Sequence, residues 1–579
     1  MNELVGPITT LICLGSAYFF FYRRLLRYMQ FLQQEDYESS RFLDWLMQRK
    51  AFDRRGSLIS LAGIALDYFV PFPLLGIAGV NVAVAAGLAY MAEREEDPRT
   101  AGKLALKMTE RAKRIFNLAC TIFILSELAV VFYGLSGGSL SHMFPAATGD
   151  RTAFDFKIAM AGFWLTQLVA FFAEPLILVL ANALLEPYEK DLQEGFANEA
   201  RAVIGKVHPF VIGITGSYGK TSSKVLLTDI LNSVAPTFTT PRSINSYMGV
   251  TREIRERMKP QHKYAVIEMG AYYTGSIKRM CTLTPPNAAI VTAVGAMHLE
   301  RFGSQENVFK AKSELPEALP KDGILVINGD YEYCRKMADN HKDKRVFVYG
   351  LEEANGHLDA YMYDLEPTDK GTNFSIRWQG KVYTGSTSLL GKPMLSNALA
   401  TFTMACVLGL NPELVLAVIK NVKTESNRLE PQRAAIASLQ AVRNGKPPRD
   451  GNILRLNDAY NSNPQGFNGA LEVLQRVSGK RKVLVTPGMI ELGERQFEEN
   501  KNCAKTAAAF CDLVIVVGGT NKQALVEGLN EGGLSADKLK QVDSMREALN
   551  FLAEDYCIDG DVVLIENDLP DLYEAVPTF

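Results

Sequence analysis

Residues 210–224 read FVIGITGSYGKTSSK, and this stretch decides how the larger part of the chain folds. The apolar run 211–215 leads into a glycine-rich turn, and a Lys-Thr pair then opens a helix-like run. In a parallel α/β sheet, phosphate binds where a strand ends and the next helix begins, because free backbone N–H groups point there. The stretch therefore predicts a loop that holds a nucleoside triphosphate.

The residue types in this loop have distinct expected roles. Glycines let backbone N–H groups close on phosphate oxygens, a lysine reaches the outer phosphates, and a threonine hydroxyl ligates Mg²⁺. The predicted nucleotide-binding residues here are Gly216, Ser217, Gly219, Lys220, Thr221 and Ser222. The strict pattern GxxxxGK[ST] needs glycine at position 214, which is Ile214, whereas the glycine is Gly213. The loop is therefore a variant of the common type.

Short apolar runs alternate with helix-like stretches after residue 209. The runs are VIGIT (211–215), YAVIEMG (264–270), AAIVTAV (288–294) and GILVING (323–329). This alternation is typical of a parallel sheet with helices on its faces.

The first 186 residues are far more apolar. Residues 5–22 form an uncharged run near the length of about 20 residues that spans a bilayer. Further apolar runs cover 57–92, with a break at FVPFP (69–73), then 115–136 and about 158–184. Counting 57–92 as a hairpin of two segments, we expect about five membrane segments. Asp67 lies near the break, where we expect an interfacial position.

Basic residues between these runs predict the orientation in the membrane. Segments 23–55 and 93–114 are rich in lysine and arginine, whereas 137–153 holds only Arg151. Basic loops stay in the cytoplasm. The chain is thus expected to be a multi-pass protein of the cell membrane, with an external N-terminus and its phosphate loop in the cytoplasm.

Composition excludes several classes of protein. The net charge of −2 gives no basic field for nucleic acid, so no nucleic-acid partner is expected. The eight cysteines are scattered without a CxxC pair, which argues against a zinc ribbon or a disulfide framework.

Further motifs follow the phosphate loop in a fixed order. They are INSYMGV (244–250), EMGAYYTGSI (268–277), AMHLERFGSQENVFKAKSE (296–314), LSNALA (395–400), NRLEP (427–431) and NDAYNSNP (457–464). Together they resemble the Mur ligase family, the ATP-dependent amide ligases of peptidoglycan synthesis. The last motif is similar to that of the member that adds D-alanyl-D-alanine. The resemblance covers about residues 205–566.

The resemblance implies a fold and a reaction. It implies a parallel-sheet, phosphate-loop ATPase central domain (209–424) and a smaller Rossmann-like α/β C-terminal domain (425–579). The residues before them predict a membrane helical region (1–186) from their apolar runs and a polar linker helix (187–208). The reaction transfers the γ-phosphoryl group of ATP to a carboxylate, and an amine then attacks the acyl phosphate. Domain closure is expected because phosphate contacts come from both domains.

Site residues are also implied by the resemblance. Two Mg²⁺ sites are expected, with Thr221, Glu268, His298 and Lys312 as ligands, Lys312 in a carbamylated (N6-carboxylated) form. Asn397 is expected at adenine, and Arg428 at the ATP phosphates. Asp458 and Asn461 are expected at ribose, phosphate or amine, and Asn245 and Ser246 at the carboxylate substrate. Catalysis is expected to depend on Lys220, Glu268, His298, Lys312 and Arg428.

Departures from the family leave the substrates open. Membrane segments stand where relatives hold the UDP end of their substrate, so the carboxylate substrate could be a small molecule or lipid-linked. The GDVVL strand (560–564) is followed by acidic residues (566–574) in place of a basic KGSR stretch, and Pro393 replaces a usual histidine. A membrane-tethered poly-amino-acid synthase, a nucleotide-binding scaffold and a transporter stay open as alternatives.

Overall fold

The computed structural model describes residues 2–69, 74–100, 105–135, 151–271, 273–295, 302–353, 356–368, 371–422, 429–440, 446–459 and 462–569. The chain divides into two compact units, one ending at Leu192 and the other running from Gln193 to Leu569.

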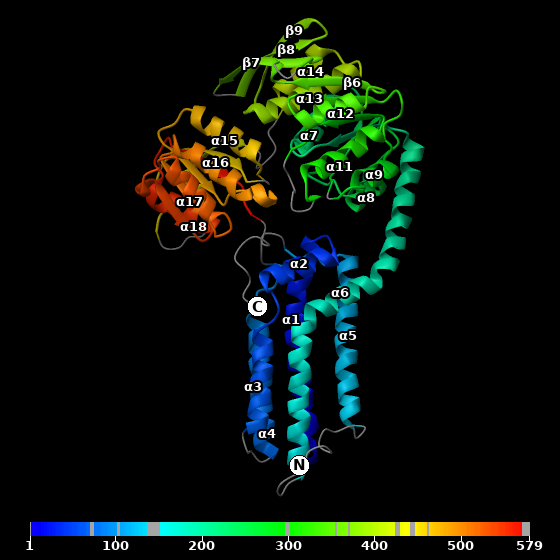
Figure 1. Cartoon of the computed structure of the whole chain (residues 1–579), viewed down its shortest axis with the longest axis vertical. Coiled ribbons are helices and arrows are strands. Elements are labelled where there is room, and N and C mark those ends of the chain that lie inside the picture. Colours follow the sequence, from blue (N-terminus) through cyan, green and yellow to red (C-terminus); the bar gives the residue numbers. More distant parts are fainter. Residues whose placement is uncertain are drawn as a thin grey trace. The chain divides into compact units, whose positions relative to one another are not determined.

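Helices make up the first unit, and its long helices run side by side (Figure 1). The helices are α1 (Asn2–Gln34), α2 (Ser39–Arg49), α3 (Arg55–Phe69), α4 (Leu74–Arg94), α5 (Glu110–Leu135) and the first part of α6 (Arg151–Val207). Aromatic side chains fill the interior, as in the edge-to-face pair of Phe20 and Phe171 at 4.8 Å between ring centroids.

Three helices among the described residues are long and apolar enough to cross a membrane by length and composition: Leu4–Gln34, Leu75–Arg94 and Phe156–Val207. The other two expected segments correspond to α5 and to α3, which has 15 residues. The topology of about five segments therefore stays a prediction.

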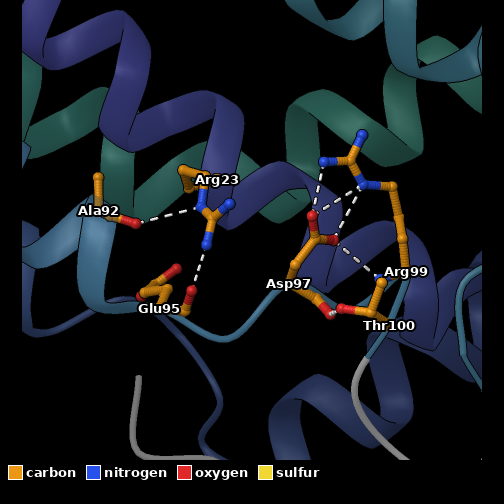
Figure 2. Close-up of polar contacts among 6 residues, drawn as sticks. All are labelled: Arg23, Ala92, Glu95, Asp97, Arg99 and Thr100. Carbon is orange, nitrogen blue, oxygen red and sulfur yellow. Dashed lines mark hydrogen bonds and ion pairs between the residues drawn. The ribbon is translucent and has the colours of Figure 1, made fainter.

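Arg23 of α1 ties the polar end of α4 to the bundle (Figure 2). Arg23 Nε donates to the carbonyl of Ala92 at 3.1 Å, and its Nη2 donates to the carbonyl of Glu95. A cation at these carbonyls satisfies the unpaired acceptors at a helix C-terminus. In the adjoining loop, Arg99 Nε donates to Asp97 Oδ1 at 2.9 Å and Arg99 Nη2 donates to Oδ2 at 2.6 Å.

Arg24 is buried, although it belongs to the basic segment 23–55 that follows the first apolar run. Its guanidinium lies 3.1 Å from a carboxylate oxygen of Asp53 and 3.0 Å from one of Glu95. Asp53 also accepts the backbone N–H of Ser57 at 3.0 Å, at the start of α3. The sequence interpretation placed Arg24 in a basic loop. In the structure α1 continues to Gln34, and the arginine turns inward to the buried Asp53 and the partly buried Glu95.

Asp67 is buried in the bundle, with 2% of its surface exposed. Asn81 donates to its carboxylate at 2.9 Å, and the indole N–H of Trp164 donates to Asn81 Oδ1 at 2.5 Å. Asp67 therefore belongs to a polar network that joins α3, α4 and α6.

The second unit begins with the central domain, built on a sheet of nine strands in the order β2-β3-β1-β4-β5-β6-β7-β8-β9. The first seven strands in this order, β1 included, pair in parallel, and β8 and β9 add an antiparallel edge. The strands are β1 (Phe210–Thr215), β2 (Thr237–Thr239), β3 (Tyr264–Glu268), β4 (Ala288–Val291), β5 (Ile324–Asn328), β6 (Arg345–Gly350), β7 (Ala360–Thr368), β8 (Gly371–Trp378) and β9 (Lys381–Thr387). The expected parallel α/β sheet is confirmed.

Helices cover both faces of this sheet, because alternate side chains of the buried strands point to opposite faces. Val211 enters one core, while Ile212 and Ile214 enter the other. The end of α6 also packs here, through Ala197 and Ala200. The covering helices are α7 (Lys220–Asn232), α8 (Tyr247–Arg257), α9 (Ser276–Leu283), α11 (Gln305–Glu317), α12 (Glu332–Asn340), α13 (Lys392–Val407) and α14 (Pro412–Lys420).

A smaller α/β domain follows, on a sheet of six strands in the order β10-β11-β15-β12-β13-β14. Only the β10–β11 pair is antiparallel. Its strands are β10 (Glu430–Ala435), β11 (Asn452–Asp458), β12 (Lys482–Thr486), β13 (Leu513–Val517), β14 (Leu539–Val542) and β15 (Val562–Glu566). Its helices are α15 (Pro464–Arg476), α16 (Gln496–Ala508), α17 (Lys522–Glu531) and α18 (Met545–Phe551), with short helical turns η3 (Ile436–Leu439), η4 (Gly493–Arg495), η5 (Ala536–Lys538) and η6 (Leu552–Tyr556).

Candidate active site

The phosphate loop connects β1 to α7 at the point where the strand order of the central sheet reverses. Strand β1 lies between β3 and β4, so their carboxyl ends flank the loop. This switch point is where open α/β sheets bind ligands. The structure therefore places residues 216–219 at the strand end and helix start where the sequence predicts the phosphate loop.

Two glycines let the loop adopt its path. Gly219 has φ +77°, and a Cβ atom added there would lie 2.1 Å from Oδ1 of Asn397. A Cβ atom on Gly216 would lie 1.9 Å from the hydroxyl oxygen of Thr292. A side chain at either position would collide with these neighbours. With glycine at both positions, the loop backbone stays accessible to a ligand.

Residues after β4 hold the loop from the side. The N–H of Ser217 donates to the carbonyl of Ala293 at 2.8 Å, and the N–H of Gly295 donates to the Ser217 hydroxyl at 3.0 Å. The Thr292 hydroxyl donates to the carbonyl of Tyr218. Ser217 therefore shapes the loop through both its backbone and its side chain.

Lys220 folds back over the loop. Its Nζ donates to the carbonyl of Gly216 at 2.7 Å and lies 3.4 Å from that of Ser217. The positive charge thus lies at the loop itself, where the outer phosphates of a nucleotide are expected. Ser222 is buried, and among the described residues its hydroxyl has no hydrogen-bond partner.

Glu268, the last residue of β3, is buried beside the loop with 1% of its surface exposed. Its Oε1 accepts the Thr221 hydroxyl at 3.1 Å and the Asn245 amide at 2.9 Å. Its Oε2 lies 3.2 Å from Nζ of Lys224. The structure thus brings Thr221, Glu268 and Asn245 together, three residues that the sequence pointed to separately.

Sequence reasoning missed Lys224. A lysine within a helix is usually solvated, yet the Lys224 side chain is only 1% exposed. One signal was present: Lys224 follows Thr221 by three residues, so both side chains share one face of α7.

Lys312 lies on α11 and is buried, with 4% of its surface exposed. Burial lowers the pKa of its ammonium well below the ordinary range, and the positive charge of Lys220 lowers it further. Cys334 acts in the opposite direction. The uncharged amine form is therefore more accessible to Lys312 than to an exposed lysine.

The residues expected at adenine and at the carboxylate substrate also lie close to the loop. Asn397 faces Gly219 of the phosphate loop, and its amide lies 3.9 Å from Sδ of Met394. Ser246 precedes α8 at its N-cap position without a side-chain capping bond. Contact of these residues with adenine or substrate stays a prediction.

In the C-terminal domain, Asp458 and Glu566 are register partners at the carboxyl ends of β11 and β15. Asp458 accepts the N–H of Leu429 at 3.1 Å, and the Ser462 hydroxyl donates to Glu566. Burial raises the pKa of Glu566 well above its ordinary range, and the negative charge of Asp458 raises it further. The acidic stretch noted in the sequence thus begins inside the domain.

Three expected site residues, His298, Arg428 and Asn461, lie outside the described residues. Within the described ranges, no three histidine, cysteine, aspartate or glutamate side chains converge on a point that could hold a metal ion. The Thr221 hydroxyl and one Glu268 oxygen nevertheless fit Mg²⁺, which usually takes one or two carboxylates and completes its shell with phosphates and water.

Comparisons with known proteins agree with this geometry. Residues 214–405 match the Mur ligase middle domain, and residues 411–566 match the Mur ligase glutamate ligase domain. The UDP-N-acetylmuramoyl-tripeptide–D-alanyl-D-alanine ligase of Escherichia coli is 31% identical over 381 residues, covering 63% of this chain and 79% of the relative. The Bacillus subtilis enzyme of the same name is 28% identical over 52% of this chain and 61% of its own length.

Solved structures share the fold. MurF from Acinetobacter baumannii superposes with a TM-score of 0.54 and 24% identity, over 65% of this chain and 77% of its own. MurF from Thermotoga maritima, solved with ADP, gives the same TM-score and identity over 65% of this chain and 80% of its own. The family match covers both domains of the second unit, and the chain belongs to the Mur ligase family, the ATP-dependent carbon–nitrogen ligases of peptidoglycan synthesis.

Proposed function

We propose that this chain is a membrane-anchored peptide ligase that activates a carboxylate as an acyl phosphate and then joins it to an amine. The contact between Thr221 and Glu268 carries the proposal, because it puts a hydroxyl and a carboxylate together directly behind the phosphate loop. Phosphoryl transfer needs a metal-bridged nucleotide held in this way.

The reaction has two steps. A carboxylate oxygen of the first substrate attacks the γ-phosphorus of ATP, and ADP leaves. The amine nitrogen of the second substrate then attacks the carbonyl carbon, phosphate leaves with the carboxylate oxygen, and the nitrogen loses a proton. A free carboxylate has no such leaving group, so ATP supplies one.

Residues of this chain position the groups and neutralise charge. Lys220 binds the outer phosphates, and the loop N–H groups orient them for in-line transfer. Thr221 and Glu268 would hold Mg²⁺, which would neutralise phosphate charge. Arg428, Asp458 and Asn461 are proposed to reach the nucleotide or the amine from the C-terminal domain.

Lys312 is proposed to be carbamylated. Its uncharged amine attacks CO₂, the nitrogen loses a proton, and the product is an anionic carbamate. The lowered pKa of Lys312 supports this step, because only the uncharged amine is a nucleophile. Together with His298, the carbamate would hold a second Mg²⁺ that an ammonium would repel.

The substrates are proposed from chemistry and from the relatives. The relatives' names give a UDP-linked muramoyl tripeptide and D-alanyl-D-alanine. In the part of the chain that the structure describes, three helices are long and apolar enough to cross a membrane, which supports a lipid-linked carboxylate precursor reached at the cytoplasmic face. We place the N-terminus outside the cell and both ligase domains in the cytoplasm.

Isotope transfer tests the reaction directly. The full chain, in nanodiscs, receives Mg²⁺, ATP, an amine such as D-alanyl-D-alanine and a muramoyl peptide labelled with ¹⁸O in its carboxylate. The peptide is supplied either UDP-linked or lipid-linked. We expect ¹⁸O in the released phosphate, one amide per ATP, and preference for the lipid-linked form.

Two results would contradict the proposal. If the rate of ATP hydrolysis does not depend on the carboxylate substrate and no amide forms, the protein is not a ligase. Amide formation without ¹⁸O in phosphate would remove the acyl phosphate. A ladder of products from one acceptor would instead identify the poly-amino-acid synthase.

A further inference from the structure

Lys224 stands out among the buried charges of the second unit. It lies on α7 with its side chain 1% exposed, and its Nζ is 3.2 Å from Glu268 Oε2. The same Nζ donates to the carbonyl of Arg242. An ammonium taken out of water is unfavourable unless it is paired and hydrogen-bonded, and Glu268 and the Arg242 carbonyl supply both kinds of contact to Lys224.

The two oxygens of Glu268 face different groups. Oε1 accepts the Thr221 hydroxyl at 3.1 Å and the Asn245 amide at 2.9 Å, whereas Oε2 faces Lys224. The ammonium therefore fixes the rotation of the carboxylate. Oε1 is the oxygen left beside the Thr221 hydroxyl.

Lys224 also holds the segment that carries Asn245. The carbonyl of Arg242 accepts its Nζ, and the N–H of Gly270 donates to the carbonyl of Asn245 at 3.1 Å. Arg242 itself has φ +49°, which a side chain rarely adopts without support. One ammonium thus joins α7, the end of β3 and the 240–246 segment.

We propose that Lys224 is a positioning residue that orients Glu268 for the metal–nucleotide complex and locks the 240–246 segment beside it. The inference rests on the proposed Mg²⁺ site at Thr221 and Glu268. Groups that orient a metal ligand without touching the metal change metal affinity by about 10- to 100-fold. Lys224 is placed to have an effect of this size.

Metal binding gives a readout that does not depend on turnover. Mn²⁺ binding to the full chain with a non-hydrolysable ATP analogue is measured by electron paramagnetic resonance, for the wild type, Lys224→Met and Ser223→Ala. We expect Lys224→Met to weaken Mn²⁺ binding by about 10- to 100-fold. Ser223→Ala, the matched control on the neighbouring buried position of α7, keeps wild-type binding.

A double-mutant cycle shows whether Lys224 acts through Glu268. In a Glu268→Gln background, Lys224→Met is expected to cause little further loss of Mn²⁺ binding, because the carboxylate that it orients is gone. Equal losses in both backgrounds would overturn the proposal, as would unchanged Mn²⁺ binding in Lys224→Met. If the wild type binds no Mn²⁺ with the nucleotide, the proposed metal site fails as well, which separates the two failures.

Folding provides a second test. Removing one partner of a buried ion pair is strongly destabilising, whereas replacing both is far milder. If Lys224→Met does not fold, the pair Lys224→Met with Glu268→Gln is expected to fold. Loss of folding in the double variant too would give Lys224 a structural role only and would overturn the proposal.

Discussion

The hydroxyl of Thr221 donates to Oε1 of Glu268 across 3.1 Å, although 47 positions separate the two residues in the chain. The contact exists because β1 and β3 are parallel neighbours, so the helix start after β1 faces the last residue of β3. One sheet register therefore places a carboxylate beside the loop that holds phosphate.

Removing the charge of Lys220 should abolish ATP turnover. Lys220 donates to a loop carbonyl, and its ammonium is a cation at the expected phosphate position. Lys220→Met is expected to lower the rate of ADP release by about 100-fold or more, the size seen when one charge-stabilising group is lost. Lys342→Met, at an exposed lysine, is the control. Unchanged ADP release in Lys220→Met would show that the nucleotide does not bind at this loop.

The parallel sheet and the phosphate loop could be predicted because their signal is local. Buried parallel strands read as short apolar runs, and the residues 216–222 carry the loop chemistry in sequence order. Glu268 was found from its strand-end position and motif. These features need no knowledge of distant packing.

Buried charges could not be predicted, because pairing across the fold decides them. From the sequence, Lys224 is expected to be a surface lysine, but in the fold it is buried and paired with Glu268 at the end of β3. From the sequence, Arg24 is expected in a basic loop, but in the fold it forms ion pairs with Asp53 and Glu95. The sequence likewise did not show that α6 continues as one helix from Arg151 to Val207.

A single methyl group on the loop should block nucleotide binding. Gly219 has φ +77°, and its added Cβ would lie 2.1 Å from Asn397 Oδ1. Gly219→Ala is expected to lose binding of a fluorescent ATP analogue. Gly409→Ala is the matched control, because Gly409 has φ +91° but open space around the added Cβ. Equal effects of both changes would show that backbone strain alone, and not the shape of the loop, matters.

Lys312 should be essential and chemically replaceable. Lys312→Ala is expected to lower ligation by about 100-fold or more. Added formate or acetate should restore part of the activity by taking the place of the carbamate. Lys310→Ala, at an exposed lysine of the same helix, is the control. Wild-type ligation by Lys312→Ala would remove the carbamate from the mechanism.

Glu566 should make the C-terminal domain less stable as pH rises. Its folded-state pKa is raised, so between the ordinary glutamate value and the folded value the folded state binds more protons than the unfolded state. Stability therefore falls with rising pH across that window, by about 1.4 kcal/mol for each unit of raised pKa. Glu566→Gln should remove this fall in thermal unfolding scans from pH 4 to pH 8. The exposed Glu498→Gln should keep it. A fall that persists in Glu566→Gln would assign it to another group.

Arg24 should support the helical unit far more than Arg99 does. Arg24 is 4% exposed and pairs with the buried Asp53 and the partly buried Glu95, so its removal leaves a buried carboxylate without its cation. Arg24→Met is expected to lower the free energy of unfolding by about 3–5 kcal/mol. Arg99 is 43% exposed and pairs with Asp97, so Arg99→Met is expected to cost at most about 1 kcal/mol.

Denaturation of the full chain in detergent micelles, followed by helical circular dichroism, measures both variants. The difference has a direct physical origin: solvent screens the Arg99 pair (Figure 2), whereas the Arg24 pairs lie inside the bundle. A double variant, Arg24→Met with Asp53→Asn, should recover part of the loss because the uncompensated charge is gone. Equal losses for Arg24→Met and Arg99→Met would mean that water reaches Arg24, and the buried pair would then contribute no more than a surface pair.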